Sequence, residues 1–246
     1  MSELFSIQLQ NRQQSRDGVW LDLPTTTEQV QAALRQIDIS SDNPQGLFIS
    51  GYFAEEEKRF AIPYNMVLAS NVDELNFLAS RLETLSTGER AELNAALQAP
   101  QSELFSIGRI TDFPENVDYY VHLPDVHGPA QLGDYYLNRS GMVDMPEEWK
   151  GGIDTAQFGR YVAQQEQGVF TEYGYLVKSG DAWQKVHEGQ PVPEEYRVLS
   201  FPAPEVLRDS ANIPPPVQPE TEPQKVIPII LNGKDSVERM KEITDR

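Results

Sequence analysis

A six-residue phrase, SELFSI, occurs twice in this chain, and further matching phrases come after each copy in the same order. Each copy leads to a stretch that closes in Leu-Pro, then to a helix-like segment, and later to an apolar, β-like phrase. The matching pairs are SELFSI at 2–7 and 102–107, VWLDLP at 19–24 and YYVHLP at 119–124, TTTEQVQAALRQI and GPAQLGDYYLNRS after them, and GLFISGYFA from Gly46 and GVFTEYGYLV from Gly168. This recurrence predicts two related units that superpose over residues 2–54 and 102–177, with an insertion in the second unit around 138–167.

Local patterns indicate what each unit contains. The first phrases have the apolar composition of strands, and RDG at 16–18 is a plausible hairpin turn between them. Thr25, Thr26 and Thr27 can cap a helix, and an apolar stripe at helical spacing comes after them. Each unit is therefore expected to be a hairpin, then a helix, then a further strand.

The residues between the two units have helical periodicity instead. Ser86-Thr87-Gly88-Glu89 interrupts the pattern and starts a second helix, so residues 71–99 are predicted to form a helical hairpin. The predicted fold class is α+β, with two β-rich units flanking a helical unit. The predicted segments are a β-rich domain at 1–68, a helical domain at 69–100, a second β-rich domain with a helical insertion at 101–200, a proline-rich linker at 201–224 and a short strand-helix element at 225–246.

The chain is acidic along most of its length. It holds 38 Asp and Glu residues against 20 Lys and Arg residues, which gives a formal net charge of −18. The charge is interspersed with core residues, so it must decorate a folded surface that repels nucleic acid and attracts proteins that bind nucleic acid. The chain has no cysteine, no signal-peptide pattern and no apolar run near the ~20 residues that span a bilayer, so we expect a cytoplasmic protein without membrane contact.

No motif for catalysis or cofactor binding stands out. His122 and His127 lie near Asp125, but their spacing fits no zinc motif. The acidic pairs Glu147–Glu148 and Glu194–Glu195 would suit a hydrolase only if two carboxylates faced each other, and adjacent helical carboxylates point apart. Basic residues are too few for direct nucleic-acid binding. We therefore expect no catalytic residue, no metal and no cofactor.

Three longer phrases in this order resemble the ArdA family of antirestriction proteins, which conjugative plasmids and transposons encode. The phrases are VWLDLP, VDELNFLASRLETLSTGERAELNAAL and LGDYYLNRSGMVDMPEEWKGGIDTAQFGRYVAQQEQGVFTEYGYL, and the resemblance covers roughly residues 3–178. The last phrase is the most specific. It contains Tyr135-Tyr136, Ile153-Asp154, Phe158-Gly159-Arg160 and Gly168-Val169-Phe170.

This resemblance implies three small domains in a row, an elongated and curved homodimer, and carboxylates laid out like the phosphates of bent B-form DNA. Such a protein occupies the DNA-binding groove of type I restriction-modification enzymes, so its partner is the methyltransferase core. Arg81 and Arg90 make the middle helices less acidic than is usual in the family. The carboxylates expected to contribute are Asp73, Glu74, Glu83, Glu89, Glu92, Asp112, Glu115, Asp118, Asp125, Asp134, Asp144, Glu147, Glu148 and Asp154.

Two alternative functions are compatible with the same sequence. In the first, the fold serves as a protein-interaction adaptor of a mobile element, and the C-terminal element with VIPIIL and KEITDR docks another protein. The carboxylates should then be scattered and paired with Lys and Arg. In the second, the mimic inhibits another DNA-binding defence complex, such as a CRISPR effector.

The expected dimer contact should avoid the acidic surface, because apposed carboxylates repel. The least acidic candidate surface holds Phe170, Tyr173, Tyr175 and Leu176. We therefore predict that the two protomers meet through the second β-rich unit.

Overall fold

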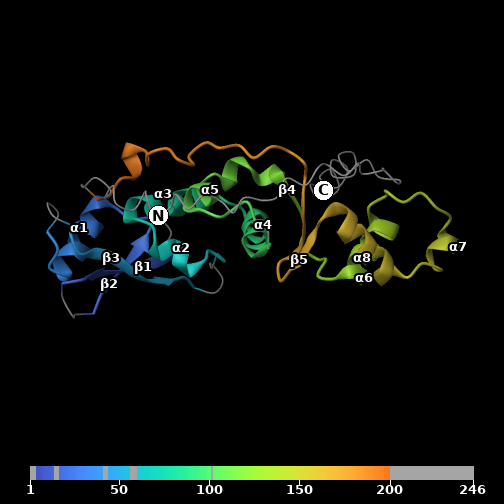
Figure 1. Ribbon diagram of the computed structural model, residues 1–246, viewed down its shortest axis with the longest axis horizontal. Coiled ribbons are helices and arrows are strands. Elements are labelled where there is room, and N and C mark those ends of the chain that lie inside the picture. The colour runs from blue at the N-terminus through green and yellow to red at the C-terminus, as the bar shows by residue number, and fades with distance from the viewer. Residues whose placement is uncertain (1–3, 14–16, 41–43, 56–59, 101, 200–246) are drawn as a thin grey trace, which may run out of the picture.

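The structure is a computed structural model that describes residues 4–13, 17–40, 44–55, 60–100 and 102–199. The molecule is elongated, with one three-stranded sheet near one end and a second small sheet toward the other (Figure 1). Helices lie between and beyond the two sheets, so the fold is a mixture of helix and sheet, as the α+β prediction requires.

The first sheet confirms the hairpin, helix and strand predicted for the N-terminal unit. Its strands are antiparallel in the order β2-β1-β3, and α1 follows the hairpin. Strand β1 buries Phe5, Ile7 and Leu9, which lie on the same face of the strand because successive side chains alternate between its two faces. Thr26 caps α1 with a reciprocal capping box. The bounds are β1 Phe5–Asn11, β2 Val19–Leu23, α1 Thr27–Gln36 and β3 Leu47–Phe53.

The predicted helical hairpin is present. Helices α3 and α4 both begin with capping boxes, in which Asn71 pairs with Glu74 and Ser86 pairs with Glu89. Their apolar stripes face the core through residues such as Leu75, Leu78 and Leu82. The bounds are α2 Tyr64–Leu68, α3 Val72–Leu82 and α4 Thr87–Gln98.

The second SELFSI copy does not form a strand, and the predicted superposition of residues 2–54 on 102–177 is therefore wrong. In this copy Ser106 caps a short helix, α5, through a hydrogen bond that its hydroxyl accepts from the backbone N–H of Arg109. Two 3₁₀ turns then lead to β4, which pairs with β6 rather than with a preceding strand. The bounds are α5 Ile107–Thr111, η2 Phe113–Glu115, η3 Val117–Tyr119 and β4 Tyr120–Leu123.

Beyond β4 the chain forms the far end of the molecule. Its sheet is antiparallel in the order β4-β6-β5. Helices α6 and α8 pack closely where Gly133 meets Gly159, and Asp154 caps α8. The bounds are α6 Pro129–Asp134, the π-helical turn η4 Tyr135–Arg139, α7 Glu147–Lys150, α8 Thr155–Glu166, β5 Val169–Thr171 and β6 Gly174–Lys178.

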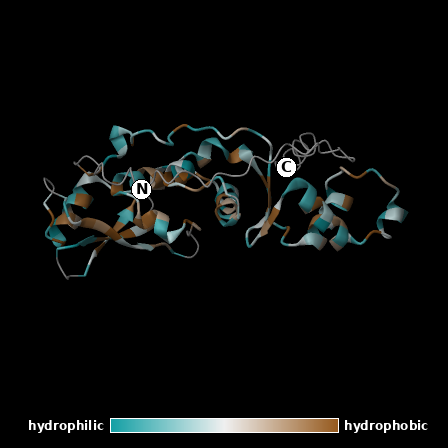
Figure 2. Ribbon diagram, in the orientation of Figure 1, coloured by the Kyte–Doolittle hydropathy of each residue, from teal (hydrophilic) through white to brown (hydrophobic). Residues whose placement is uncertain are grey.

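Two groups of buried apolar side chains hold these elements together. The larger one joins the first sheet to α3, α4 and α5 and extends to Tyr120 and Leu176 of the second sheet. The smaller one lies in the far end around Tyr136, Tyr175 and Val162. Hydrophobic residues line the first sheet, whereas α7 at the far tip is hydrophilic (Figure 2). The division at residues 68, 100 and 200 stays a prediction, and the segments 201–224 and 225–246 lie outside the described residues.

Residues 179–199, here called the strap, run back from β6 along the body of the molecule toward the first sheet (Figure 1). The strap holds one 3₁₀ turn, η5 Glu194–Tyr196. Its backbone N–H groups donate hydrogen bonds to Asp112, beside α5, and to Asp73 of α3. The strap therefore connects the second sheet to the helices in the middle of the molecule.

Candidate functional site

The predicted acidic surface divides into two groups of carboxylates with different environments. Six of the predicted carboxylates are exposed in the segment from η3 to the start of α8, and we call them the distal carboxylates. They are Asp118, Asp125, Asp144, Glu147, Glu148 and Asp154. A seventh exposed acid, Glu172 in the turn between β5 and β6, was not predicted, and its position in a polar turn was the available signal.

The segment 112–172 has little positive charge to balance these acids. It contains eleven Asp and Glu residues against three Lys and Arg residues, and seven of the eleven acids are exposed. Arg139 pairs with Asp134 at 3.4 Å, and Lys150 pairs with Glu147 at 2.7 Å. The far end of the molecule therefore carries a large net negative charge, most of it on exposed side chains.

Most of the predicted acids in the middle helices have local structural roles. Glu74 and Glu89 complete the capping boxes of α3 and α4, and Glu83 is the residue that ends α3. Glu115 pairs with Arg81, and both side chains are partly buried. Glu92 is also partly buried. Among the predicted carboxylates of α3, α4 and the turn between them, only Glu74 is well exposed, and the others are partly buried.

Asp112 is fully buried, so its predicted place on an exposed surface is wrong. Its carboxylate accepts hydrogen bonds from the backbone N–H groups of Val186, His187 and Glu188 at 3.2, 2.6 and 3.2 Å. A buried carboxylate is tolerated when several donors satisfy it. Asp112 therefore anchors the strap to the start of η2.

Asp73 anchors the other end of the strap. Its Oδ1 accepts hydrogen bonds from the backbone N–H groups of Val198 and Leu199 at 2.7 and 2.8 Å. Burial raises the pKa of Asp73 above its usual range, although these two donors oppose the shift. Nearby, the side-chain amide of Asn76 donates to the carbonyl of Tyr196 at 3.0 Å.

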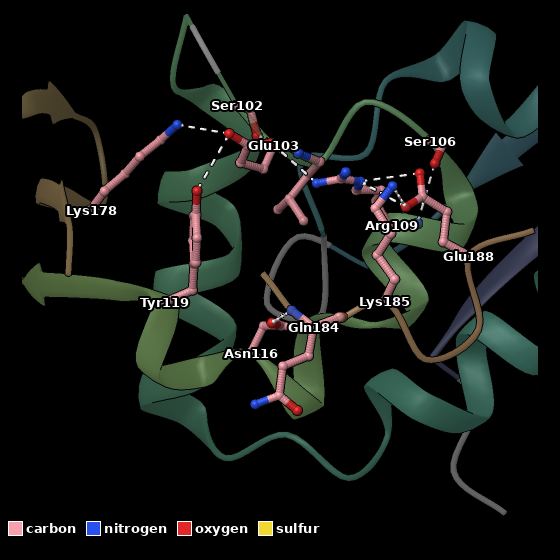
Figure 3. Close-up of polar contacts among 11 residues, drawn as sticks. Ser102, Glu103, Ser106, Arg109, Asn116, Tyr119, Lys178, Gln184, Lys185 and Glu188 are labelled. Atoms are coloured by element: carbon pink, nitrogen blue, oxygen red, sulfur yellow. Dashed lines mark hydrogen bonds and ion pairs between the residues drawn. The ribbon is translucent and has the colours of Figure 1, made fainter. Parts of the chain in front are cut away.

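Between these anchors, Arg109 forms the centre of a polar network (Figure 3). Its guanidinium contacts Glu188 of the strap and Glu103 at 3.1 Å each, and lies over the rings of Phe105 and Trp183 at 4.7 and 5.6 Å. Lys178 donates to Glu103 at 2.8 Å, and this hydrogen bond lowers the pKa of Glu103. The network joins α5 and the strap to the end of β6.

The residues proposed for a dimer contact lie largely inside the protomer. Tyr175 and Leu176 are buried in the two cores, so they are not available as an interface, and this part of the prediction is wrong. The reason is that neighbouring side chains of β6 point to opposite faces of the sheet, and each face is covered by one of the two cores. Phe170 and Tyr173 are partly exposed.

Two of the three histidines, His122 and His187, lie among structural contacts. His122 is buried, its Nε2 lies 2.7 Å from the carbonyl oxygen of Tyr173, and burial lowers its pKa. Oxygen and nitrogen atoms of Asp112, Glu115 and His187 that could bind a metal ion lie within 4.8 Å of one another. However, Asp112 already accepts hydrogen bonds from the strap, and Glu115 forms an ion pair with Arg81.

A groove of about 760 Å³ lies between α3, α5 and the strap. The two carboxylates that line it are Glu74 and Glu188. Glu74 caps α3, and Glu188 binds Arg109. Both carboxylates therefore already have structural partners, which argues against the hydrolase hypothesis.

Comparison with protein families identifies the family of this chain. A family described as "Antirestriction protein (ArdA)" matches residues 14–177, about two thirds of the chain. The chain belongs to the ArdA antirestriction family. The match includes all the distal carboxylates and ends before the strap begins.

A comparison with individually curated proteins gives no match. None of the helices in the described part of the chain is long and apolar enough to cross a membrane. Membership of the ArdA family implies an antirestriction function.

Proposed function

We propose that this ArdA protein acts as a mimic of B-form DNA that occupies the DNA-binding site of type I restriction-modification enzymes. The observation that carries the proposal is the charge of the segment 112–172, where seven exposed acids stand against three basic residues, two of them already paired. The action is binding alone, so it needs no catalytic group and no cofactor.

Electrostatics supports a target that normally binds DNA. Duplex DNA carries about one negative charge per 1.7 Å of its axis, and proteins that grip it present Lys and Arg along a groove. Carboxylates fixed on a helix or at its cap, as Glu147, Glu148 and Asp154 are, satisfy such a groove without the entropic cost of ordering a flexible chain. Asp154, for example, is held by its hydrogen bond from the N–H of Gln157 at 3.0 Å while its side chain remains exposed.

A competition experiment tests the proposal. A DNA duplex carrying the recognition site should displace the protein from a type I methyltransferase core, and the affinity should fall steeply as salt is raised. The double substitution Asp144→Asn, Glu148→Gln should weaken binding and make the salt dependence shallower. The matched control is Glu194→Gln with Glu195→Gln, which removes two exposed acids of the strap instead.

Three outcomes count against the proposal. They are binding that DNA does not displace, affinity that does not respond to salt, and an equal loss from the control substitutions. If DNA displaces the protein only from a different DNA-binding defence complex, the result supports DNA mimicry but contradicts the type I enzyme as the target.

The adaptor hypothesis has support in the body of the molecule. Glu103, Glu115 and Glu188 are paired with Lys or Arg, which is the pattern that a protein-interaction role predicts. These pairs attach structural elements to one another, however, and none of them involves a distal carboxylate.

A homodimer remains part of the proposal because it would double the acidic surface, and sedimentation at micromolar concentration tests it.

A further inference from the structure

The far tip of the molecule exposes a tryptophan among its carboxylates. Trp149 on α7 is 68% exposed, the largest value among the big hydrophobic side chains in the described ranges. It comes directly after Glu147 and Glu148 in the sequence. An indole side chain in water forgoes a large burial free energy, which it would gain if a partner covered it.

The arrangement of α7 turns this tryptophan and its acidic neighbour outward. The Lys150 side chain folds back, is only 15% exposed, and donates to Glu147 at 2.7 Å. Glu148 and Trp149 are both exposed. The short helix projects at the far end of the molecule (Figure 1).

The charges around Trp149 restrict what can cover it. A second copy of this acidic tip would be repelled, and an uncharged apolar partner would desolvate the adjacent carboxylates without compensation. A surface rich in Arg and Lys can contact both the carboxylates and the exposed indole. Its cations can pair with the carboxylates and also lie against the face of the indole, which is the best cation–π acceptor among the side chains.

We propose that Trp149 is an aromatic anchor of the antirestriction interface, with its ring face against an Arg or Lys side chain of the target's DNA-binding groove and Glu148 paired beside it. This inference rests on the proposed function. It adds a contact that duplex phosphates do not offer, and such buried aromatic and Arg contacts carry much of the affinity in protein interfaces.

The test measures affinity for the type I methyltransferase core at several salt concentrations. Trp149→Ala should weaken binding by roughly tenfold or more, because cation–π contacts that lose water are among the stronger ones. Trp149→Phe should retain most of the affinity, since it keeps a ring face. Trp149→Ala should leave the slope of affinity against salt unchanged because it removes no charge, whereas Glu148→Gln should make that slope shallower.

The matched control is Trp20→Ala. Trp20 is 49% exposed on β2, near the opposite end of the molecule. This substitution should leave affinity unchanged, and thermal unfolding of each variant checks that the fold survives. Trp149→Ala with wild-type affinity, or an equal loss from Trp20→Ala, overturns the anchor while leaving mimicry intact if DNA still displaces the wild type. If DNA does not displace the wild type, the proposed function itself fails.

Discussion

The carboxylate of Asp112 accepts a hydrogen bond from the backbone N–H of His187 at 2.6 Å, across 75 residues of sequence. Two neighbouring N–H groups, of Val186 and Glu188, bind the same carboxylate. A single buried side chain thus fixes the middle of the strap to the body. Because the strap starts at β6 and ends on α3, this contact links the second sheet to the helices beside the first.

Replacing Asp112 should therefore destabilise the whole molecule. Asp112→Ala leaves three backbone N–H groups without their acceptor and should lower the free energy of unfolding by about 2 to 4 kcal/mol. Urea denaturation measures the effect. Asp125→Asn is the control, since Asp125 is exposed, and it should change stability by less than about 0.5 kcal/mol. Equal stability of the two variants would mean that the strap is not held by Asp112.

Arg109 attaches the strap at a second point. Its planar guanidinium reaches Glu103 and Glu188 together and stacks over two rings, which the point charge of lysine cannot reproduce. Arg109→Lys should cost about 1 to 3 kcal/mol in stability although the net charge is unchanged. Thermal unfolding beside the exposed control Arg160→Lys measures it, and matched midpoints for the two variants would contradict the role assigned to the network.

The contact between α6 and α8 depends on glycine at two facing positions. A Cβ at Gly159 would lie 1.8 Å from the carbonyl oxygen of Pro129, and one at Gly133 would lie 1.9 Å from that of Thr155. Both obstacles are backbone atoms and cannot move aside. Gly159→Ala should therefore force the helices apart, at a cost of about 1 to 3 kcal/mol or more.

A helical glycine without this crowding provides the control. A Cβ at Gly88 in α4 meets nothing within 4 Å, so Gly88→Ala should be neutral or stabilising by up to about 1 kcal/mol. Hydrogen exchange would show whether the loss in Gly159→Ala is concentrated in α6 and α8. A Gly159→Ala protein as stable as the wild type would contradict the close packing.

The two SELFSI copies show where sequence patterns mislead. Leu4 and Leu104 are both buried, but Phe5 is 1% exposed and Phe105 is 63% exposed. The hydroxyl of Ser6 donates to Asp22 across a strand pair, whereas that of Ser106 caps a helix. The hexapeptide is compatible with both structures, so its tertiary surroundings decide between them. The first copy leads into β1, which pairs with β2 and β3, whereas the second copy leads into α5.

Caps and local periodicity were predictable because they depend on residues a few positions apart. The Thr26 and Asp154 caps, the helical hairpin and the first sheet all arise from such signals. The burial of Asp112 was not predictable, because its donors are backbone groups of the strap and leave no trace in side-chain spacing. An acidic residue counted from sequence looks the same whether it faces solvent, as Asp125 does, or binds backbone N–H groups inside the protein.

Glu166 places a carboxyl group inside the far end of the molecule. The hydroxyls of Tyr136 and Tyr175 both donate to it. Burial raises the pKa of Glu166 above its ordinary value of 4.5, although the two phenols oppose the shift. The protonated form is therefore favoured by folding, and its contribution to stability is fully present below the unfolded pKa and is lost as pH rises through the folded pKa.

Glu166→Gln removes this titration and so isolates it. The stability of the wild type relative to Glu166→Gln should fall as pH rises above 4.5 and then level off once the folded pKa is passed. Tyr175→Phe removes one donor that lowers the pKa of Glu166, so in that background the fall should extend to higher pH. Urea denaturation between about pH 4 and pH 8 measures all the variants. A constant difference between wild type and Glu166→Gln at every pH would show that Glu166 titrates alike in the folded and unfolded chains.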